Sequence, residues 1–273
     1  NEKLSLKGKI TEEGIFTLFV KSKGAGVYID NQKIKIIGHA DSIHKIKVYG
    51  SKTTEAFAEV LHALSCCPDL YKPLAIKHNT SPAGALALMA AARRMSEDER
   101  WEIYNNLETS VQESKQGLSL RRVLESMSAT SIGKIMPAII GVTVNGYTIS
   151  TSTLLEKSKL TIIDFWASWC FPCRKQIPDL LKFYTEFGKH GLKVISISLD
   201  DNKEKWEKAL LADKTPWPQI SDLKAFSKGS IAQKLGITGI PQYFIIDNMG
   251  IVIEKSNNIS SLDNFIRKKL NIN

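Results

Sequence analysis

Two cysteines separated by two residues, Cys170 and Cys173, follow directly on the apolar run Leu160–Trp166. The run has the length of one buried strand, and Pro172 suits the first turn of a helix. The cysteine pair is therefore expected where a strand passes into the following helix. Free backbone N–H groups and the positive end of the helix dipole favour a thiolate at that place. This predicts an α/β unit in which Cys170 is the attacking nucleophile and Cys173 is the resolving thiol.

The chemistry that such a pair permits is thiol–disulfide exchange. Cys170 would attack a partner disulfide, and Cys173 would break the mixed disulfide and release the reduced partner. A zinc site would need two more ligands at matching spacing, and the other cysteines, Cys66 and Cys67, lie far upstream. A purely structural bridge is the alternative, but one that closes so short a loop would add little stability. We therefore expect no metal, and no cofactor other than the redox-active disulfide Cys170–Cys173.

The sequence around the cysteines carries a resemblance to a known family. Residues Asp164–Pro178, which read DFWASWCFPCRKQIP, resemble the active-site segment of the thioredoxin superfamily, in particular its TlpA/ResA-like branch of the cell envelope. Thr238–Pro241 resembles the cis-proline loop of that family, and Asp200–Ser221, with a helix around Lys203–Ala212, resembles the insert of the branch. The resemblance implies a thioredoxin fold, with a central mixed β-sheet flanked by helices. It also implies a thiol–disulfide oxidoreductase that acts as a reductase rather than as an oxidant.

The resemblance implies roles for residues beside the cysteines. Asp164 stands where the family has a buried acid beneath the disulfide, and burial would raise its pKa so that it could accept a proton from the resolving thiol. Pro241 is expected in the cis form, so that the backbone of Ile240 could pair with an extended substrate segment. The alternatives are an Asp164 that only accepts hydrogen bonds and a Pro241 that is an ordinary loop proline. The branch often has a glutamate where this chain has Gln176, so we expect no acid role there.

Two aromatic residues, Trp169 and Phe171, flank the nucleophile. At an exposed helix tip they are expected to form, with Pro172, an apolar rim on which partner proteins dock, although simple packing is the alternative. Pro178 is expected to kink the helix that Pro172 begins.

Residues 1–130 are expected to form a smaller α+β domain, with antiparallel strands within 4–51 and helices within 53–127. Alternating residues such as Lys33–Ile36 and His44–Val48 predict an antiparallel sheet with one solvent-exposed face. A turn is expected at Ser22–Gly26. This half resembles, less specifically, an uncharacterised domain that often precedes envelope thioredoxin-like domains, and no reaction is assigned to it.

Helix starts and the second domain are marked by local motifs. Ser81–Pro82 and Ser96–Glu99 have the pattern of helix N-termini. A hinge is expected near Ser128–Lys134, and a redox domain is expected over 131–273. That domain should open with a hairpin over Ile139–Ile149, centred on Asn145–Gly146.

Cys66 and Cys67 are expected at the end of a helix that begins near Thr53. A disulfide between neighbours needs a distorted peptide and is rare, so two free, partly buried thiols are expected. An auxiliary redox or metal-holding pair is the alternative. The histidines show no mutual spacing typical of a metal site, and all are expected to be surface or packing residues: His39, His44, His62, His78 and His190.

Composition bears on partners and compartment. The 273 residues have no apolar run approaching a membrane span, and their formal net charge of +9 is interleaved with acids in both halves. Nucleic acid is therefore not expected as a partner. The chain opens without methionine or an apolar signal core, so we expect a mature or trimmed sequence that lacks its targeting segment. The resemblance implies the periplasm or envelope of a bacterium. It also implies exported proteins with cysteines as clients, among them apocytochromes awaiting haem, and a membrane thiol relay as electron donor.

Other functions use the same fold. A thiol peroxidase would have Thr or Ser three residues before the nucleophile, where this chain has Ala167. Copper(I) carriers of this fold resemble Cys-x-x-x-Cys with a distant histidine, whereas the spacing here is shorter and no histidine follows His190. A further alternative is a binding module in the first domain that tethers the redox unit.

Overall fold

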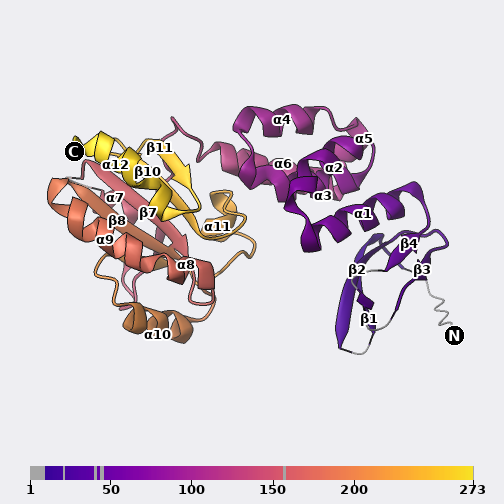
Figure 1. Ribbon diagram of the computed structural model, residues 1–273, viewed down its shortest axis with the longest axis horizontal. Helices are drawn as coiled ribbons and strands as arrows, with labels where there is room; N and C mark the ends of the chain where they lie inside the picture. Colours follow the sequence, from indigo (N-terminus) through magenta and orange to yellow (C-terminus); the bar gives the residue numbers. More distant parts are fainter. Residues whose placement is uncertain (1–9, 21, 40–41, 44–45, 156–157, 273) are drawn as a thin grey trace. The chain divides into compact units, whose positions relative to one another are not determined.

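The computed structural model describes residues 10–20, 22–39, 42–43, 46–155 and 158–272. The chain divides into two compact units, Asn1–Leu124 and Glu125–Asn273 (Figure 1). A domain boundary was predicted after residue 130, whereas the two units meet inside helix α6 (Lys115–Ser128).

The strands of the first unit form two separate hairpins. Strand β1 (Gly14–Val20) pairs antiparallel with β2 (Lys23–Ile29), and β3 (Lys35–Ile37) pairs antiparallel with β4 (Lys47–Tyr49). The predicted antiparallel pairing is therefore present, but it is divided between two two-stranded sheets. The predicted strand residues before residue 10, together with His44, lie outside the described part of the chain.

The turn predicted over Ser22–Gly26 is confirmed at Ser22 but is shorter than predicted, because β2 already begins at Lys23 and pairs there with Val20. Gly24 lies inside the strand, opposite Phe19. A Cβ at Gly24 would lie 2.9 Å from Thr17 Cγ2 and 3.1 Å from the Phe19 ring. The glycine thus makes room for larger side chains across the hairpin rather than breaking the strand.

Helices follow the hairpins. Helix α1 starts after Ser51, whose side chain accepts a hydrogen bond from the Thr54 N–H at 3.0 Å. Its Phe57 ring stacks on Tyr28 of β2 at 4.0 Å between centroids, which attaches the first hairpin to the helix. The helices that precede α6 in this unit are α1 (Lys52–Cys66), α2 (Tyr71–Lys77), α3 (Pro82–Ala91), α4 (Glu97–Asn105) and α5 (Thr109–Gln112).

The predicted helix starts are confirmed. The Ser81 side chain accepts a hydrogen bond from the Ala83 N–H at the start of α3. At α4, Ser96 and Glu99 form a reciprocal capping box, so both residues satisfy backbone groups that the helix leaves unpaired.

Cys66 and Cys67 close α1, as expected, but they are not free thiols. The two sulfurs form a disulfide between adjacent residues, with the Cα atoms 3.7 Å apart. The expectation of burial was wrong for Cys66 as well, because its side chain is exposed at the last turn of the helix. The pair is therefore accessible to solvent at Cys66.

The second unit is built on a seven-stranded mixed sheet in the order β11-β10-β7-β8-β9-β5-β6. The central strands β7, β8 and β9 are parallel, whereas β10, β11, β5 and β6 pair antiparallel with their neighbours. The strands are β5 (Ile140–Val142), β6 (Thr148–Ser150), β7 (Leu160–Trp166), β8 (Leu192–Ser198), β9 (Gln219–Ser221), β10 (Gln242–Asp247) and β11 (Val252–Ser256).

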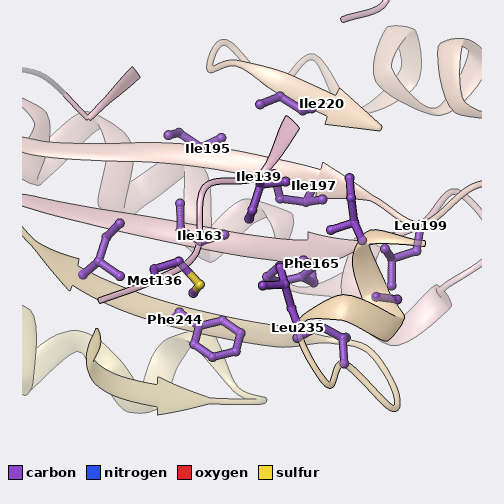
Figure 2. Packing of buried hydrophobic residues seen from close by; sticks show 14 of the residues in the cluster. Met136, Ile139, Ile163, Phe165, Ile195, Ile197, Leu199, Ile220, Leu235 and Phe244 are labelled. Atoms are coloured by element: carbon purple, nitrogen blue, oxygen red, sulfur yellow. The ribbon is translucent and has the colours of Figure 1, made fainter. Parts of the chain in front are cut away.

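Helices cover this sheet and enclose two apolar cores. One core joins Ile163, Phe165 and Phe244 to residues of α11 and of the segment that enters the unit (Figure 2). The other joins Ile162 to Phe183 of α9 and Ile266 of α12. The helices are α7 (Thr151–Leu154), α8 (Phe171–Lys175), α9 (Ile177–Phe187), α10 (Lys203–Asp213), α11 (Ile231–Lys234) and α12 (Asp263–Leu270).

The hairpin predicted over Ile139–Ile149 is present as β5 and β6, and Gly146 has a φ of 82° in its turn. The predicted fold class, a thioredoxin fold preceded by a smaller α+β part, is confirmed. Among the residues described, no helix combines the length and apolar character needed to cross a bilayer.

Candidate active site

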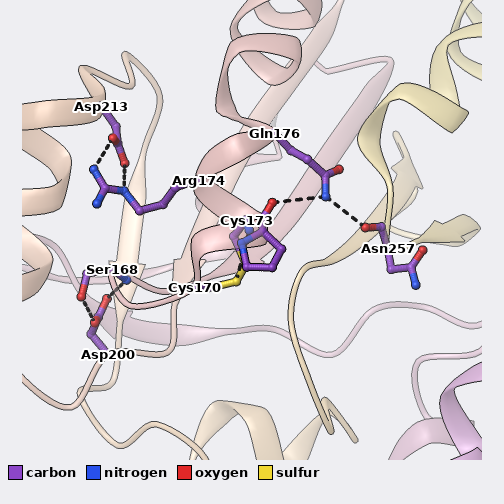
Figure 3. The surroundings of a disulfide bond; sticks show 9 residues. Ser168, Cys170, Cys173, Arg174, Gln176, Asp200, Asp213 and Asn257 are labelled. Carbon is purple, nitrogen blue, oxygen red and sulfur yellow. Dashed lines mark hydrogen bonds and ion pairs between the residues drawn. A yellow bond between two sulfur atoms is a disulfide. The ribbon is translucent and has the colours of Figure 1, made fainter. Parts of the chain in front are cut away.

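The cysteine pair lies where the sequence predicted it, between β7 and α8. Cys170 and Cys173 form a disulfide with Cα atoms 5.3 Å apart, and Cys170 is the N-cap of the helix (Figure 3). The Cys173 N–H donates a hydrogen bond to Cys170 Sγ at 3.2 Å. Only 4% of Cys170 and 2% of Cys173 is exposed. The first sulfur thus already accepts a bond that would stabilise its thiolate after reduction.

A buried carboxylate that was not predicted from the sequence anchors the segment that leads to Cys170. Asp200, which follows β8, accepts hydrogen bonds from the Ser168 N–H at 2.9 Å and from Ser168 Oγ at 2.6 Å. Ser198 Oγ donates a third bond at 2.8 Å. Because β7 and β8 are parallel, their carboxyl ends lie at the same edge of the sheet, and this rule is the signal that could have found Asp200.

Helix α8 is also fixed from two sides. Arg174 forms a bidentate ion pair with Asp213 at the end of α10, at 2.9 and 2.6 Å (Figure 3). Trp206 of α10 is fully buried in the same apolar cluster as Cys170 and Cys173. These contacts leave the disulfide little freedom to move away from the sheet.

Gln176 joins two segments of the fold by hydrogen bonds. Its Nε2 donates to the Asn257 carbonyl at 3.3 Å, and its Oε1 accepts from the Ile259 N–H at 2.7 Å. The residue ends α8 and precedes α9, so that Pro178 falls in the first turn of a new helix. The predicted kink at Pro178 is thus a break between two helices.

Asp164 is buried in the middle of β7. Ser196 Oγ donates to its carboxylate at 2.7 Å, and the Trp217 Nε1–H donates in turn to Ser196 Oγ at 2.8 Å. Burial raises the pKa of Asp164 from 3.8 to about 7, against the opposing effect of the Ser196 hydrogen bond. Asp164 shares a strand face with Trp166, which belongs to the cluster around the cysteines.

The loop before β10 reaches the same cluster. The Ile240–Pro241 peptide bond is cis, and Ile240 packs against the cluster that contains Cys170 and Cys173. Gln242, the next residue, pairs with Phe165 near the end of β7. The fold therefore brings Ile240 and Pro241 to the end of the sheet at which the cysteines lie.

Exposed aromatic side chains flank Cys170 in the chain. Trp169 is 55% exposed and Phe171 is 77% exposed, and Pro172 is exposed beside them. Phe226, which sequence reasoning missed, is also exposed, and its ring centroid lies 6.4 Å from that of Trp169. We call Trp169, Phe171 and Phe226 the aromatic rim.

Comparison with known proteins agrees with this geometry. A family model described as the AhpC/TSA family matches residues 132–255. Thiol-disulfide oxidoreductase ResA of Bacillus cereus is 30% identical over 128 residues, which are 45% of this chain and 68% of that protein. The chain belongs to the thiol–disulfide oxidoreductases of the thioredoxin superfamily.

Other relatives of the oxidoreductase carry similar descriptions. Sporulation thiol-disulfide oxidoreductase A of Bacillus subtilis is 32% identical over 117 residues, which are 42% of this chain and 66% of that protein. A thiol:disulfide interchange protein from Bacteroides sp., solved in solution, is 30% identical with a TM-score of 0.46, and the match covers 52% of this chain and 92% of that one. Residues 1–57 match a domain of unknown function, DUF4369.

Membership confirms the predicted oxidoreductase, and neither the copper carrier nor the peroxidase is favoured. The individual roles of Cys170, Cys173, Asp164, Ile240 and Pro241 remain predictions. Among the described residues, no group of three metal-ligating side chains lies close together.

Proposed function

We propose that the oxidoreductase reduces disulfides of exported proteins through Cys170 and Cys173. The observation that carries the proposal is the Cys173 N–H directed at Cys170 Sγ at the start of α8. In the reduced protein this donor would favour the thiolate of Cys170, which makes it the nucleophile. Cys170 attacks one sulfur of the client disulfide, and the other client sulfur leaves as a thiolate and takes up a proton.

Cys173 then completes the reaction. Its thiolate attacks Cys170 Sγ, the client is released with two thiols, and the Cys170–Cys173 disulfide forms. Cys173 must lose a proton before it attacks, and the buried carboxyl of Asp164, with a pKa of about 7, is suited to accept that proton. The two electrons pass from the dithiol to the client.

The client would bind at the loop before β10. The backbone of Ile240 precedes the strand that pairs with β7, so an extended client segment could add to it by main-chain hydrogen bonds. The aromatic rim would cover the apolar side chains next to the client cysteine.

The compartment and the partners belong to the same proposal. We propose the periplasm or envelope of a bacterium, with a membrane thiol relay that returns electrons to the disulfide. Among the relatives, the thiol:disulfide interchange protein DsbE homolog of Paracoccus denitrificans is 27% identical over 136 residues, in support of a place among interchange proteins. Cysteine-containing exported proteins, apocytochromes included, are the proposed clients.

The test is reduction of insulin disulfides with dithiothreitol as donor. The Cys170→Ser variant should lose the activity, and the Cys173→Ala variant should accumulate mixed disulfides with insulin. The matched control is the double variant Cys170→Ser/Cys173→Ala, which should trap nothing. Normal insulin reduction by Cys170→Ser would overturn the proposal. Capture of clients by Cys173→Ala in the native cell would then identify the exported proteins.

A further inference from the structure

The disulfide between Cys66 and Cys67 lies at the C-terminal end of helix α1, where Cys66 is exposed. A bridge between adjacent residues closes no loop of the unfolded chain, so it adds almost no stability through chain entropy. Helix α1 does not need the bridge in order to end there. Its C-cap, Cys67, still donates its N–H to the Ala63 carbonyl at 2.8 Å, and Pro68 follows. A structural role therefore does not explain the pair.

The side chain of His62, next to the pair, indicates a chemical role instead. His62 precedes Cys66 by one turn on the same face of α1, and its Nε2 lies 4.0 Å from Cys66 Sγ. The carbonyl end of a helix disfavours a thiolate, whereas a protonated imidazole beside the sulfur favours one. Among the contacts described, His62 is thus the group that can make Cys66 the more reactive of the two thiols. Cys66 is also the more exposed.

We infer that Cys66 and Cys67 form a second thiol–disulfide exchange site, which accepts two electrons from a protein dithiol. One thiolate of the donor attacks Cys66 Sγ, the Cys66–Cys67 bond breaks, and Cys67 leaves as a thiolate and takes up a proton. The second donor thiolate then attacks the donor sulfur of this mixed disulfide. Cys66 leaves as a thiolate beside His62, and the donor keeps the new disulfide. The donor is oxidised, and the pair ends as two thiols.

The experiment uses the full chain with Cys170→Ser and Cys173→Ser, so its result does not depend on the first site. The protein is equilibrated in mixtures of reduced and oxidised dithiothreitol, acid-quenched and alkylated. Mass spectrometry then reads the tryptic peptide 53–77, which holds no cysteine other than this pair. The same peptide is read from the unaltered chain, so that a folding defect of the double variant cannot decide the outcome.

The pair should pass from disulfide to dithiol in one two-electron transition while circular dichroism shows the chain still folded. With Cys67→Ser added, oxidised glutathione should form a mixed disulfide at Cys66 at least about tenfold faster than at Cys67 in the matched Cys66→Ser protein. His62→Gln should slow that reaction at Cys66 several-fold.

Three outcomes would overturn the inference. The pair could stay as two thiols in oxidised dithiothreitol. It could stay oxidised in excess reduced dithiothreitol while the chain is native, which is the behaviour of an inert bridge. The two cysteines could also react at equal rates, unaffected by His62→Gln, which would remove the assigned order of attack.

Discussion

Asp164 places a carboxyl group in the interior of a strand, where ionisation is costly. Because the pKa is raised from 3.8 to about 7, the folded protein keeps a proton that the unfolded chain releases within this range. The contribution of Asp164 to the free energy of unfolding should therefore fall as pH rises from about 4 to about 7, and stay constant above that range.

The Asp164→Asn variant should lose this fall, since an amide can still accept the Ser196 hydrogen bond without ionising. Urea denaturation at several pH values, compared with the unaltered chain, measures the difference. Asp201→Asn, at an exposed position, is the control. Parallel stability curves for Asp164→Asn and the unaltered chain would contradict the assignment.

Asp200 should matter for both stability and exchange. Asp200→Asn replaces an acceptor of three donors by a group that is partly a donor itself, so about 1.5–3 kcal/mol of stability should be lost. The segment from Ser168 to Cys170 would also be held less firmly, and single-turnover exchange with an oxidised peptide should slow. Asp201→Asn serves again as the neighbouring control, and a fully stable, fully active Asp200→Asn protein would refute this role.

Gln176→Glu tests the amide that joins the start of α9 to the loop after β11. A carboxylate accepts from the Ile259 N–H but cannot donate to the Asn257 carbonyl, so about 1 kcal/mol should be lost at neutral pH. A protonated glutamate can donate again, and stability relative to the unaltered chain should recover as pH falls through the carboxyl pKa. Denaturation at pH values on both sides of that pKa measures the stability change. Gln233→Glu, on a surface helix, is the control variant. A pH-independent loss would exclude the donor as the cause.

At this scale the sequence predicts residues that a local motif positions, and it misses those that only the sheet brings near. Cys170, Cys173 and Asp164 belong to one continuous segment. Asp200 reaches Ser168 because the register places the end of β8 beside the end of β7, where the Leu199 N–H donates to the Trp166 carbonyl at 2.8 Å. A single sequence does not fix that register.

The hairpin of β5 and β6 packs closely against strand β9 at Gly141. A Cβ at Gly141 would lie 2.5 Å from Ile220 Cγ2 and 2.7 Å from the Ser221 carbonyl oxygen, on the strand that β5 pairs with. Gly141→Ala should therefore force the hairpin away from β9 and cost about 1–3 kcal/mol.

Gly146→Ala is the matched control for that variant. Gly146 has space for a Cβ, and only its positive φ opposes the change, so about 1 kcal/mol should be lost and the pairing of β5 with β9 should persist. Thermal unfolding measures both losses, and hydrogen exchange at Ser221 and Val142 reports the pairing. Equal effects of the two variants would contradict the packing argument.

The prediction of strand bounds failed where glycine is compatible with both a turn and a strand. Gly24 and Gly26 were predicted to lie in a turn, yet both lie in β2, and at Gly24 the close approach of Thr17 and Phe19 leaves no room for a Cβ. The helix starts at Ser81 and Ser96 were predictable because capping depends only on residues a few positions apart.

As a whole, the chain should contain a redox unit that folds by itself. Residues 125–273 retain the segment that leads into it: the Gly133 N–H donates to the Val252 carbonyl, and Met136 and Ile139 lie in its core. We expect this fragment to unfold cooperatively and to reduce insulin at the rate of the full chain. A fragment of residues 140–273 lacks those core residues and should be less stable by several kcal/mol.

Denaturation and insulin assays on the two fragments check this prediction. A short fragment as stable as the long one would show that the entry segment adds nothing. The sequence predicted two parts and the fold of the second, because strand and helix patterns are local. It placed residues 131–139 in the second unit, but it did not predict that Ile135 pairs with Ile251, since that bridge forms only in the folded chain.

The recessed position of Cys170 has a consequence for timing. Cys170 is only 4% exposed and is flanked in the chain by the exposed rings of Trp169 and Phe171, so its sulfur is reached more easily by a cystine on a projecting or unfolded segment than by one enclosed in a folded protein. We therefore expect a preference for substrates that offer the cysteine on a loose stretch of chain. Exported proteins, the proposed clients, would offer such stretches before they finish folding, so the enzyme would act on them early rather than after folding.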